Sequence, residues 1–215
     1  MKLSLIISLI TLSACGTFDL YTSAFSAFKD NLASSNKIVI DDKIKSLPYA
    51  MQIVDYYGKQ SIIVLKKNAN NRLSWVDSSN NEIITFNGKI IKTYGFQEDF
   101  EIHGSPNLEK VYTQLINSNL NITSSSFIKF SSPSTQFLEI DYSYSLISRG
   151  EMRNLISSRM EKYSLIKEEF NVPAINWKGS NFYWINGKGS TIKSKIILSP
   201  NDEKIHLRVF KSYKN

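Results

Sequence analysis

The chain has little of the residue chemistry on which metal sites and disulfides depend. It contains one cysteine and two histidines in 215 residues. A single cysteine has no partner for an intramolecular disulfide, so the fold must be stabilised by its core alone. His103 and His206 are far apart, and neither has a second histidine or a cysteine near it in sequence. Because zinc sites need several such ligands, we expect no metal site and no cofactor.

Catalytic motifs are missing as well. The sequence has no Gly-rich phosphate loop and no Gly-x-Ser-x-Gly motif. Glu139 and Asp141 lie two residues apart, a spacing that can aim two carboxylates at a sugar. The same spacing is more typical of the solvated face of a strand. We therefore predict a protein that is not an enzyme, and keep a glycan-active enzyme as the weaker alternative.

Residues 1–15 have the order of a secretory signal. Lys2 gives a basic start, and Leu3 to Leu12 is apolar apart from three hydroxyl side chains. Leu12-Ser13-Ala14-Cys15 then places small residues ahead of the only cysteine. This run of ten residues spans about 15 Å as a helix, half of a bilayer core, so a transmembrane anchor is not expected.

The last four of these residues resemble the lipobox of bacterial lipoproteins. That resemblance implies a signal peptide over residues 1–14 and acyl chains, palmitate among them, on Cys15. More than one such chain is needed for stable anchoring in a membrane. Gly16 follows, where an aspartate would retain a lipoprotein in the inner membrane of enteric-type bacteria, so we expect the periplasmic face of the outer membrane. The alternative is an ordinary signal peptide that happens to end in cysteine.

Composition indicates a globular and basic protein. Hydrophobic residues make up 42% and aromatic residues 12%, and the net charge is +7. A basic surface can meet an acidic polymer, an anionic lipid or nucleic acid. An exported lipoprotein rarely meets nucleic acid, so we expect acidic polysaccharide or lipid and no nucleic acid. A soluble surface that is merely basic is the alternative.

Two helices are predicted. Within residues 15–36, the lipid-anchored N-terminus, apolar side chains recur at steps of three and four. These residues are Phe18, Tyr21, Phe25, Phe28 and Leu32. This amphipathic helix either packs on the core of the protein or lies near the membrane or a partner. A short second helix is predicted from Leu108 to Asn117, with Asn107 as its cap.

Most of the remaining chain has the period of two that is typical of strands. Ile38 to Gly95 predicts about five short strands, with Asn87-Gly88 as a hairpin turn. Leu138 to Leu146 alternates apolar and polar residues, as in an antiparallel sheet with one wet face. Residues 97–107 are predicted as loop, and Asn186-Gly187 as the turn between two late strands. We predict one all-β domain over residues 37–215, mainly antiparallel and either a barrel or a sandwich.

Aromatic residues are dense near the C-terminus, with lysines close by in sequence. Aromatic faces stack on sugar rings, and lysines steer an acidic polymer toward them. The candidate binding surface, or its supporting wall, is Trp177, Tyr183, Trp184, Lys193 and Lys195. The alternative is that these aromatic side chains pack in the core.

Several segments together are similar to the GfcB/YjbF lipoproteins of group 4 capsule and exopolysaccharide gene clusters. The matching segments, in order, are 47–50, Trp75, 85–95, 176–177, 182–186 and Gly189. One departure is Ile192, which stands where an aromatic residue is expected after Gly189. The resemblance implies an outer-membrane lipoprotein, mostly antiparallel β, with a role in polysaccharide secretion, and it supplies no catalytic residues.

On this resemblance we predict strand for residues 149–170, against a local helical period at Met152 to Met160. The expected function is that of a non-catalytic accessory of capsule or exopolysaccharide secretion. Such an accessory would be held in the membrane by lipid on Cys15 and would bind the polymer or the export proteins. A structural or assembly lipoprotein without glycan contact is the alternative.

Overall fold

The computed structural model describes residues 38, 40–118, 120–131, 136–201 and 204–212. Cys15 and the helix expected in residues 15–36 lie outside these ranges. The strands are β1 (Met51–Tyr56), β2 (Lys59–Ala69), β3 (Arg72–Val76), β4 (Glu82–Phe86), β5 (Lys89–Tyr94), β6 (Phe100–His103), β7 (Ile122–Phe130), β8 (Leu138–Arg153), β9 (Met160–Val172), β10 (Trp177–Asn186), β11 (Thr191–Ile197) and β12 (Lys204–Lys211). The helices are α2 (Asp42–Ser46), α3 (Leu108–Ser118) and the 3₁₀ turn η1 (Pro173–Ile175).

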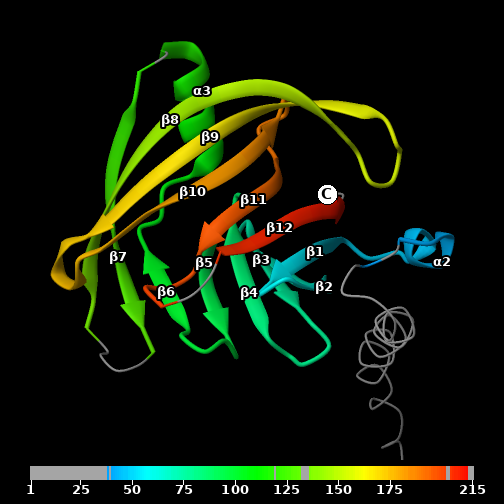
Figure 1. The fold of residues 1–215 in the computed structure, drawn as a ribbon, viewed down its shortest axis with the longest axis horizontal. Helices are drawn as coiled ribbons and strands as arrows, with labels where there is room; N and C mark the ends of the chain where they lie inside the picture. The colour runs from blue at the N-terminus through cyan, green and yellow to red at the C-terminus, as the bar shows by residue number, and fades with distance from the viewer. Residues whose placement is uncertain (1–37, 39, 119, 132–135, 202–203, 213–215) are drawn as a thin grey trace, which may run out of the picture.

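The strands form one closed antiparallel barrel. Every strand pairs with its neighbours in the sequence, and β1 pairs with β12 to close the ring (Figure 1). Closure leaves none of the twelve described strands at an open sheet edge. The structure confirms the predicted all-β, mainly antiparallel fold, and of the two predicted architectures it is the barrel that forms.

Short turns join the first strands. Tyr57-Gly58 links β1 to β2 and Asn87-Gly88 links β4 to β5, with positive φ at all four residues. Two-residue turns of this kind match the twist of the strands, which confirms the Asn87-Gly88 prediction. Gly88 is also in contact with the Thr191 hydroxyl on β11, so a larger residue would clash there.

Two local predictions were wrong. Residues 97–107 were expected to be loop, but they contain the four-residue strand β6, which Phe100 anchors in the core. The turn after β10 is longer than Asn186-Gly187. The Asn186 side chain accepts bonds from the backbone N–H groups of Lys188 and Ser190, and the positive φ falls at Gly189. An amide side chain that closes the loop takes the place of the tight two-residue turn.

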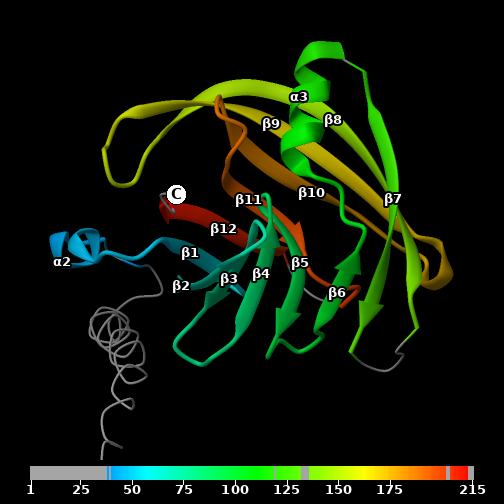
Figure 2. The same ribbon diagram turned by 180° about the vertical axis from the view of Figure 1, so that it is seen from behind.

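Strands β8 and β9 form a hairpin that is longer than the rest of the barrel. It arches over one end of the molecule toward the β1 and β12 side (Figures 1 and 2). Asn154 organises the tip, where its side chain accepts from Ile156 N and Ser157 N. The structure therefore confirms strand for most of residues 149–170, and the helical spacing at Met152 to Met160 reflects the tip between two strands.

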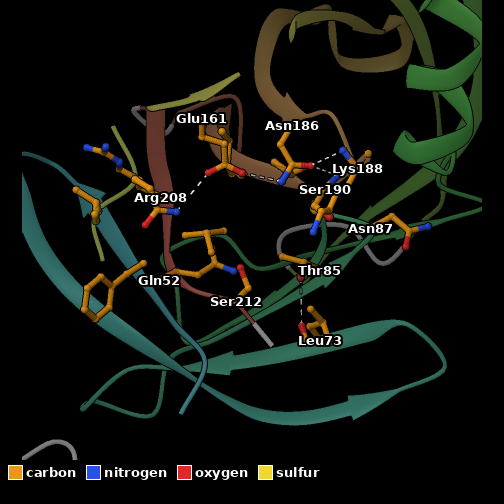
Figure 3. Close-up of a pocket in the computed structure, with 18 of the residues that line it drawn as sticks. Gln52, Leu73, Thr85, Asn87, Glu161, Asn186, Lys188, Ser190, Arg208 and Ser212 are labelled. Carbon is orange, nitrogen blue, oxygen red and sulfur yellow. Dashed lines mark hydrogen bonds between the residues drawn. The ribbon is translucent and has the colours of Figure 1, made fainter. Parts of the chain in front are cut away.

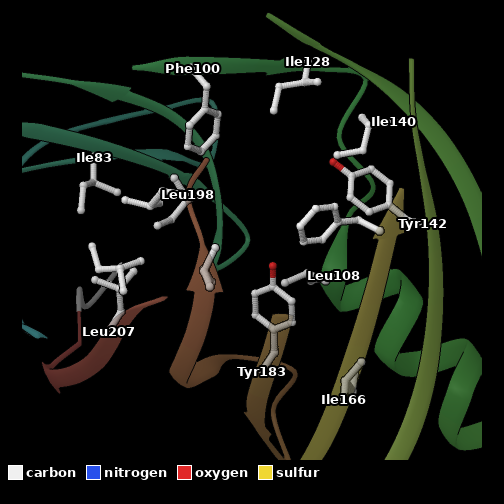
Figure 4. Close-up of a cluster of buried hydrophobic side chains, with 14 of the residues drawn as sticks. Ile83, Phe100, Leu108, Ile128, Ile140, Tyr142, Ile166, Tyr183, Leu198 and Leu207 are labelled. Carbon is white, nitrogen blue, oxygen red and sulfur yellow. The ribbon is translucent and has the colours of Figure 1, made fainter. Parts of the chain in front are cut away.

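The core fills the barrel. Alternate side chains of all strands point inward and form one apolar cluster, part of which is drawn in Figure 4. Helix α3 adds Leu108, Val111 and Leu115 to this cluster and packs on β7 and β8. Its N-terminus is capped as predicted, because Asn107 Oδ1 accepts from Glu109 N and Lys110 N.

A second apolar cluster lies around α2, where Ile44 packs with Met51, Val64 and Phe210. Leu155 at the hairpin tip packs against this cluster, so the hairpin is tied to the part of the chain that precedes β1. Within the described ranges, neither helix has the length and apolar character needed to cross a bilayer.

Candidate functional site

Basic side chains gather on the outer face of the last two strands. Cross-strand pairing places Lys193 opposite Arg208, Lys195 opposite His206, and Lys204 opposite Ile197. We call Lys193, Lys195, Lys204, His206 and Arg208 the basic face. Among the described residues, none of the five forms an ion pair. The acidic residue nearest in the ladder is Asp55 on β1, which pairs with His206.

The charges of the basic face repel one another. Partial burial lowers the pKa of Lys193, and the neighbouring Arg208 and Lys195 lower it further. The pKa of His206 is likewise lowered, first by burial and then by Lys195, with Asp55 acting in the opposite direction. Neighbouring cations thus lower the pKa of both Lys193 and His206, and a bound anion would relieve this repulsion.

The structure divides the predicted binding surface into two groups. Trp184 lies on the outer side of β10, with Lys193 Nζ 4.6 Å from its ring centroid, and Lys195 lies in the next row of the same face. Trp177 and Tyr183 point into the barrel, with exposed fractions of 8% and 0%. Trp177 packs edge-on against Phe170, so these two residues serve as core and as the wall behind the face.

A pocket of about 600 Å³ opens at the barrel end that the β8–β9 hairpin covers (Figure 3). Its walls come from the ends of β3, β4 and β12, from the β10–β11 turn and from the hairpin tip. We call it the chamber. Its lining is rich in side-chain amides: Gln52, Asn68, Asn71, Asn87, Asn154 and Asn186. In Figure 3, Gln52 and Arg208 face Lys188 and Ser190 across the space.

Specific contacts hold the hairpin over the chamber. Arg208 Nη2 donates to the Arg153 carbonyl at 2.8 Å. Glu161 accepts from Asn186 Nδ2 at 2.9 Å and from Asn154 Nδ2 at 3.3 Å. Arg208 therefore belongs to the basic face and also fixes the hairpin, so the two features share one wall.

A third polar group is buried inside the barrel. Lys89 Nζ lies 2.5 Å from Glu168 Oε2, with side-chain exposed fractions of 2% and 0%. Asn181 and Tyr183 donate to Glu168 Oε1, and Lys89 lies over the ring of Tyr142. Burial lowers the pKa of Lys89, and the charge of Glu168 opposes that shift. The cavity beside this network is about 20 Å³, which is too small for a substrate.

Comparisons with known proteins show which family the chain belongs to. The family model described as group 4 capsule polysaccharide lipoprotein gfcB, YjbF matches residues 23–210. The chain belongs to the YjbF family. Its members are described as lipoproteins of group 4 capsule polysaccharide, and the resemblance noted in the sequence is confirmed. No curated protein matches the chain.

One solved structure shares the fold of this YjbF-family chain. The hypothetical lipoprotein YmcC from Escherichia coli (K12) is 16% identical, with a TM-score of 0.66 over 97% of this chain and 100% of that one. Likeness at that identity shows the shared fold only. A Parabacteroides distasonis chain described as a lipoprotein is 6% identical over 76% of this chain and 93% of that one, and its TM-score of 0.33 is too low to support an argument.

Some features of the candidate site in this YjbF-family chain could have been found from the sequence, and others could not. Among the described residues no cluster of metal-ligating side chains is found. The basic face has a signal, because Lys193, Lys195, His206 and Arg208 fall on alternate positions of two adjacent strands. The Lys89–Glu168 pair has almost none, since β5 and β9 are far apart in sequence. Its one hint is a glutamate among the inward positions of β9.

Proposed function

We propose that this YjbF-family lipoprotein is a non-catalytic accessory of capsule polysaccharide secretion that binds an acidic stretch of the polymer along its basic face. The observation that supports the proposal is the row of cations on β11 and β12 beside the ring of Trp184, which form no ion pair within the described part of the chain. Cations attract the carboxylates of an acidic polysaccharide, and an aromatic face stacks on its sugar rings. Among the described residues, the carboxylate that strand pairing places beside this row is that of Asp55.

The proposed location is the periplasmic face of the outer membrane, with lipid on Cys15 as the anchor. Cys15→Ala should move the protein from the membrane fraction to the soluble periplasmic fraction, because the acyl chains supply the anchoring energy. Membrane fractionation in high salt and carbonate measures this. A Cys15→Ala protein that stays with the membrane would show that something other than lipid holds it there.

Binding through the basic face is tested by Lys193→Gln with Lys195→Gln. Arg208 is left in place because it also holds the hairpin. The double variant should bind the host's purified secreted polymer roughly tenfold more weakly, the loss of about two surface charge contacts. The measurement is calorimetry on full-length protein in detergent, at low and high salt. Wild-type affinity should fall with added salt because exposed charges are screened.

The matched control removes the same charge elsewhere. Lys67 and Lys162 are exposed on other strands, so Lys67→Gln with Lys162→Gln should leave affinity unchanged. Equal weakening in both double variants would mean that only net charge matters and that the basic face is not a site. Neutral dextran should not bind. Cleavage of the polymer during the titration would favour the glycan-active enzyme instead.

A further inference from the structure

The chamber contains polar groups that the protein itself does not satisfy. Gln52 points into it from β1 with an exposed fraction of 6%, and no hydrogen bond joins its side-chain amide to any described residue. The Thr191 hydroxyl, also in the lining, is buried without a partner among the described residues. Buried polar groups in folded proteins are nearly always paired, so an unpartnered hydroxyl at Thr191 is unusual. The Gln52 amide is directly available to a ligand, and the Thr191 hydroxyl becomes available when its side chain turns away from Gly88.

The remaining lining matches one class of ligand. Side-chain amides both donate and accept hydrogen bonds, as sugar hydroxyls require. Asn68, Asn71 and Asn87 supply further amides, and Lys188 adds a cation at the rim. The volume of about 600 Å³ lies in the usual range for a small-molecule site. Apolar side chains such as Leu73, Met152 and Ile192 also line the space, but polar side chains outnumber them, which favours a hydroxyl-rich ligand over a lipid chain.

We propose that the chamber is a second binding site, which takes a short hydroxyl-rich oligosaccharide and holds it through Gln52 and Thr191. The site adjoins the basic face at Arg208, but the other four basic residues of that face lie outside the chamber. It shares with the proposed function only the chemical class of the ligand, so either can be wrong without the other. The hairpin that roofs the chamber, fixed by Arg208 and Glu161, would restrict it to a chain end or a short segment.

The test uses oligosaccharides of two to six sugars, released from the host's secreted polymer by partial acid hydrolysis. These are titrated into the full-length protein in detergent. In two-dimensional NMR, the Gln52 side-chain amide and the Thr191 backbone amide should shift. Gln52→Met should weaken binding about tenfold, and Thr191→Val several-fold, since each loses a ligand hydrogen bond. Gln114→Met on the exposed side of α3 is the matched control and should bind like wild type.

Stability separates a binding role from a structural one. Because Gln52 makes no hydrogen bond to the described protein, Gln52→Met should leave the Tm within about 2 °C of wild type. If Gln52→Met fails to fold, the Thr191→Val titration and the wild-type shifts still decide the question. Wild-type affinity in both Gln52→Met and Thr191→Val, or the absence of shifts at these residues, overturns the proposal.

The two proposals fail in different ways. Lys193→Gln with Lys195→Gln should bind the oligosaccharides within about twofold of wild type, because these lysines lie outside the chamber. If the oligosaccharides lose affinity in that variant and not in Gln52→Met, the chamber proposal is wrong and the basic face is the sugar site. If Gln52→Met weakens oligosaccharide binding but the Lys193→Gln, Lys195→Gln variant binds long polymer like wild type, the proposal for the basic face is wrong. The proposal for the chamber is then supported.

Discussion

Replacing Lys89 by methionine should lower the free energy of unfolding by about 3–5 kcal/mol, because it leaves the Glu168 carboxylate charged and unpaired in the core. Glu168 is fully buried and would keep the bonds from the neutral donors Asn181 and Tyr183. Those two neutral donors cannot replace a cation at 2.5 Å. Urea denaturation monitored by tryptophan fluorescence measures the loss.

The same strand offers a matched control. Lys92 pairs with Glu101 at 2.7 Å, with side chains that are 25% and 34% exposed. A pair of that kind contributes about 0–1 kcal/mol, so Lys92→Met should cost little. Adding Glu168→Gln to Lys89→Met should recover part of the loss, since the remaining group is then uncharged. Equal costs at Lys89 and Lys92 would contradict the role given to the buried pair.

The second large effect is expected at Trp177. Trp177→Ala should cost about 3–5 kcal/mol, because it opens a cavity beside Phe130 and Phe170. Trp184→Ala should cost about 1 kcal/mol or less, because that ring lies on the outer side of β10. Polymer affinity should change in the opposite order, with Trp184→Ala weakening it and Trp177→Ala leaving it intact in the folded fraction.

Thermal unfolding and polymer calorimetry on both variants check this pair of expectations. Similar stability costs at the two positions would mean that Trp184 is part of the core as well. Polymer affinity that is unchanged in Trp184→Ala would remove the aromatic part of the proposed surface and leave only the charges.

The fold could be predicted from sequence where the signal is local. The Asn87-Gly88 turn and the alternation of Leu138 to Leu146 each depend on residues that are close in the chain. The choice between barrel and sandwich could not be made this way. It depends on whether β1 pairs with β12, a contact between strands about 150 residues apart.

For the candidate site, too, the features with a local sequence signal could be predicted and those that depend on long-range contacts could not. Trp177, Tyr183 and Trp184 were predicted as a binding surface because aromatic residues are dense in that part of the sequence. Such density does not show which side of a strand faces the core. Strand pairing decides this, and it places Trp184 outside and the other two inside. The chamber and the Lys89–Glu168 pair had no usable signal, because each is assembled from segments that meet only when the barrel closes.

The most direct test of the central claim is the amount of secreted capsule polymer per cell in a strain that carries Lys193→Gln with Lys195→Gln in place of the wild-type protein. Membrane-bound protein is quantified in parallel, and the Lys67→Gln with Lys162→Gln strain serves as the control. The account predicts a clear loss of secreted polymer at normal levels of anchored, folded protein, with normal secretion in the control. Wild-type secretion in the Lys193→Gln, Lys195→Gln strain would contradict it.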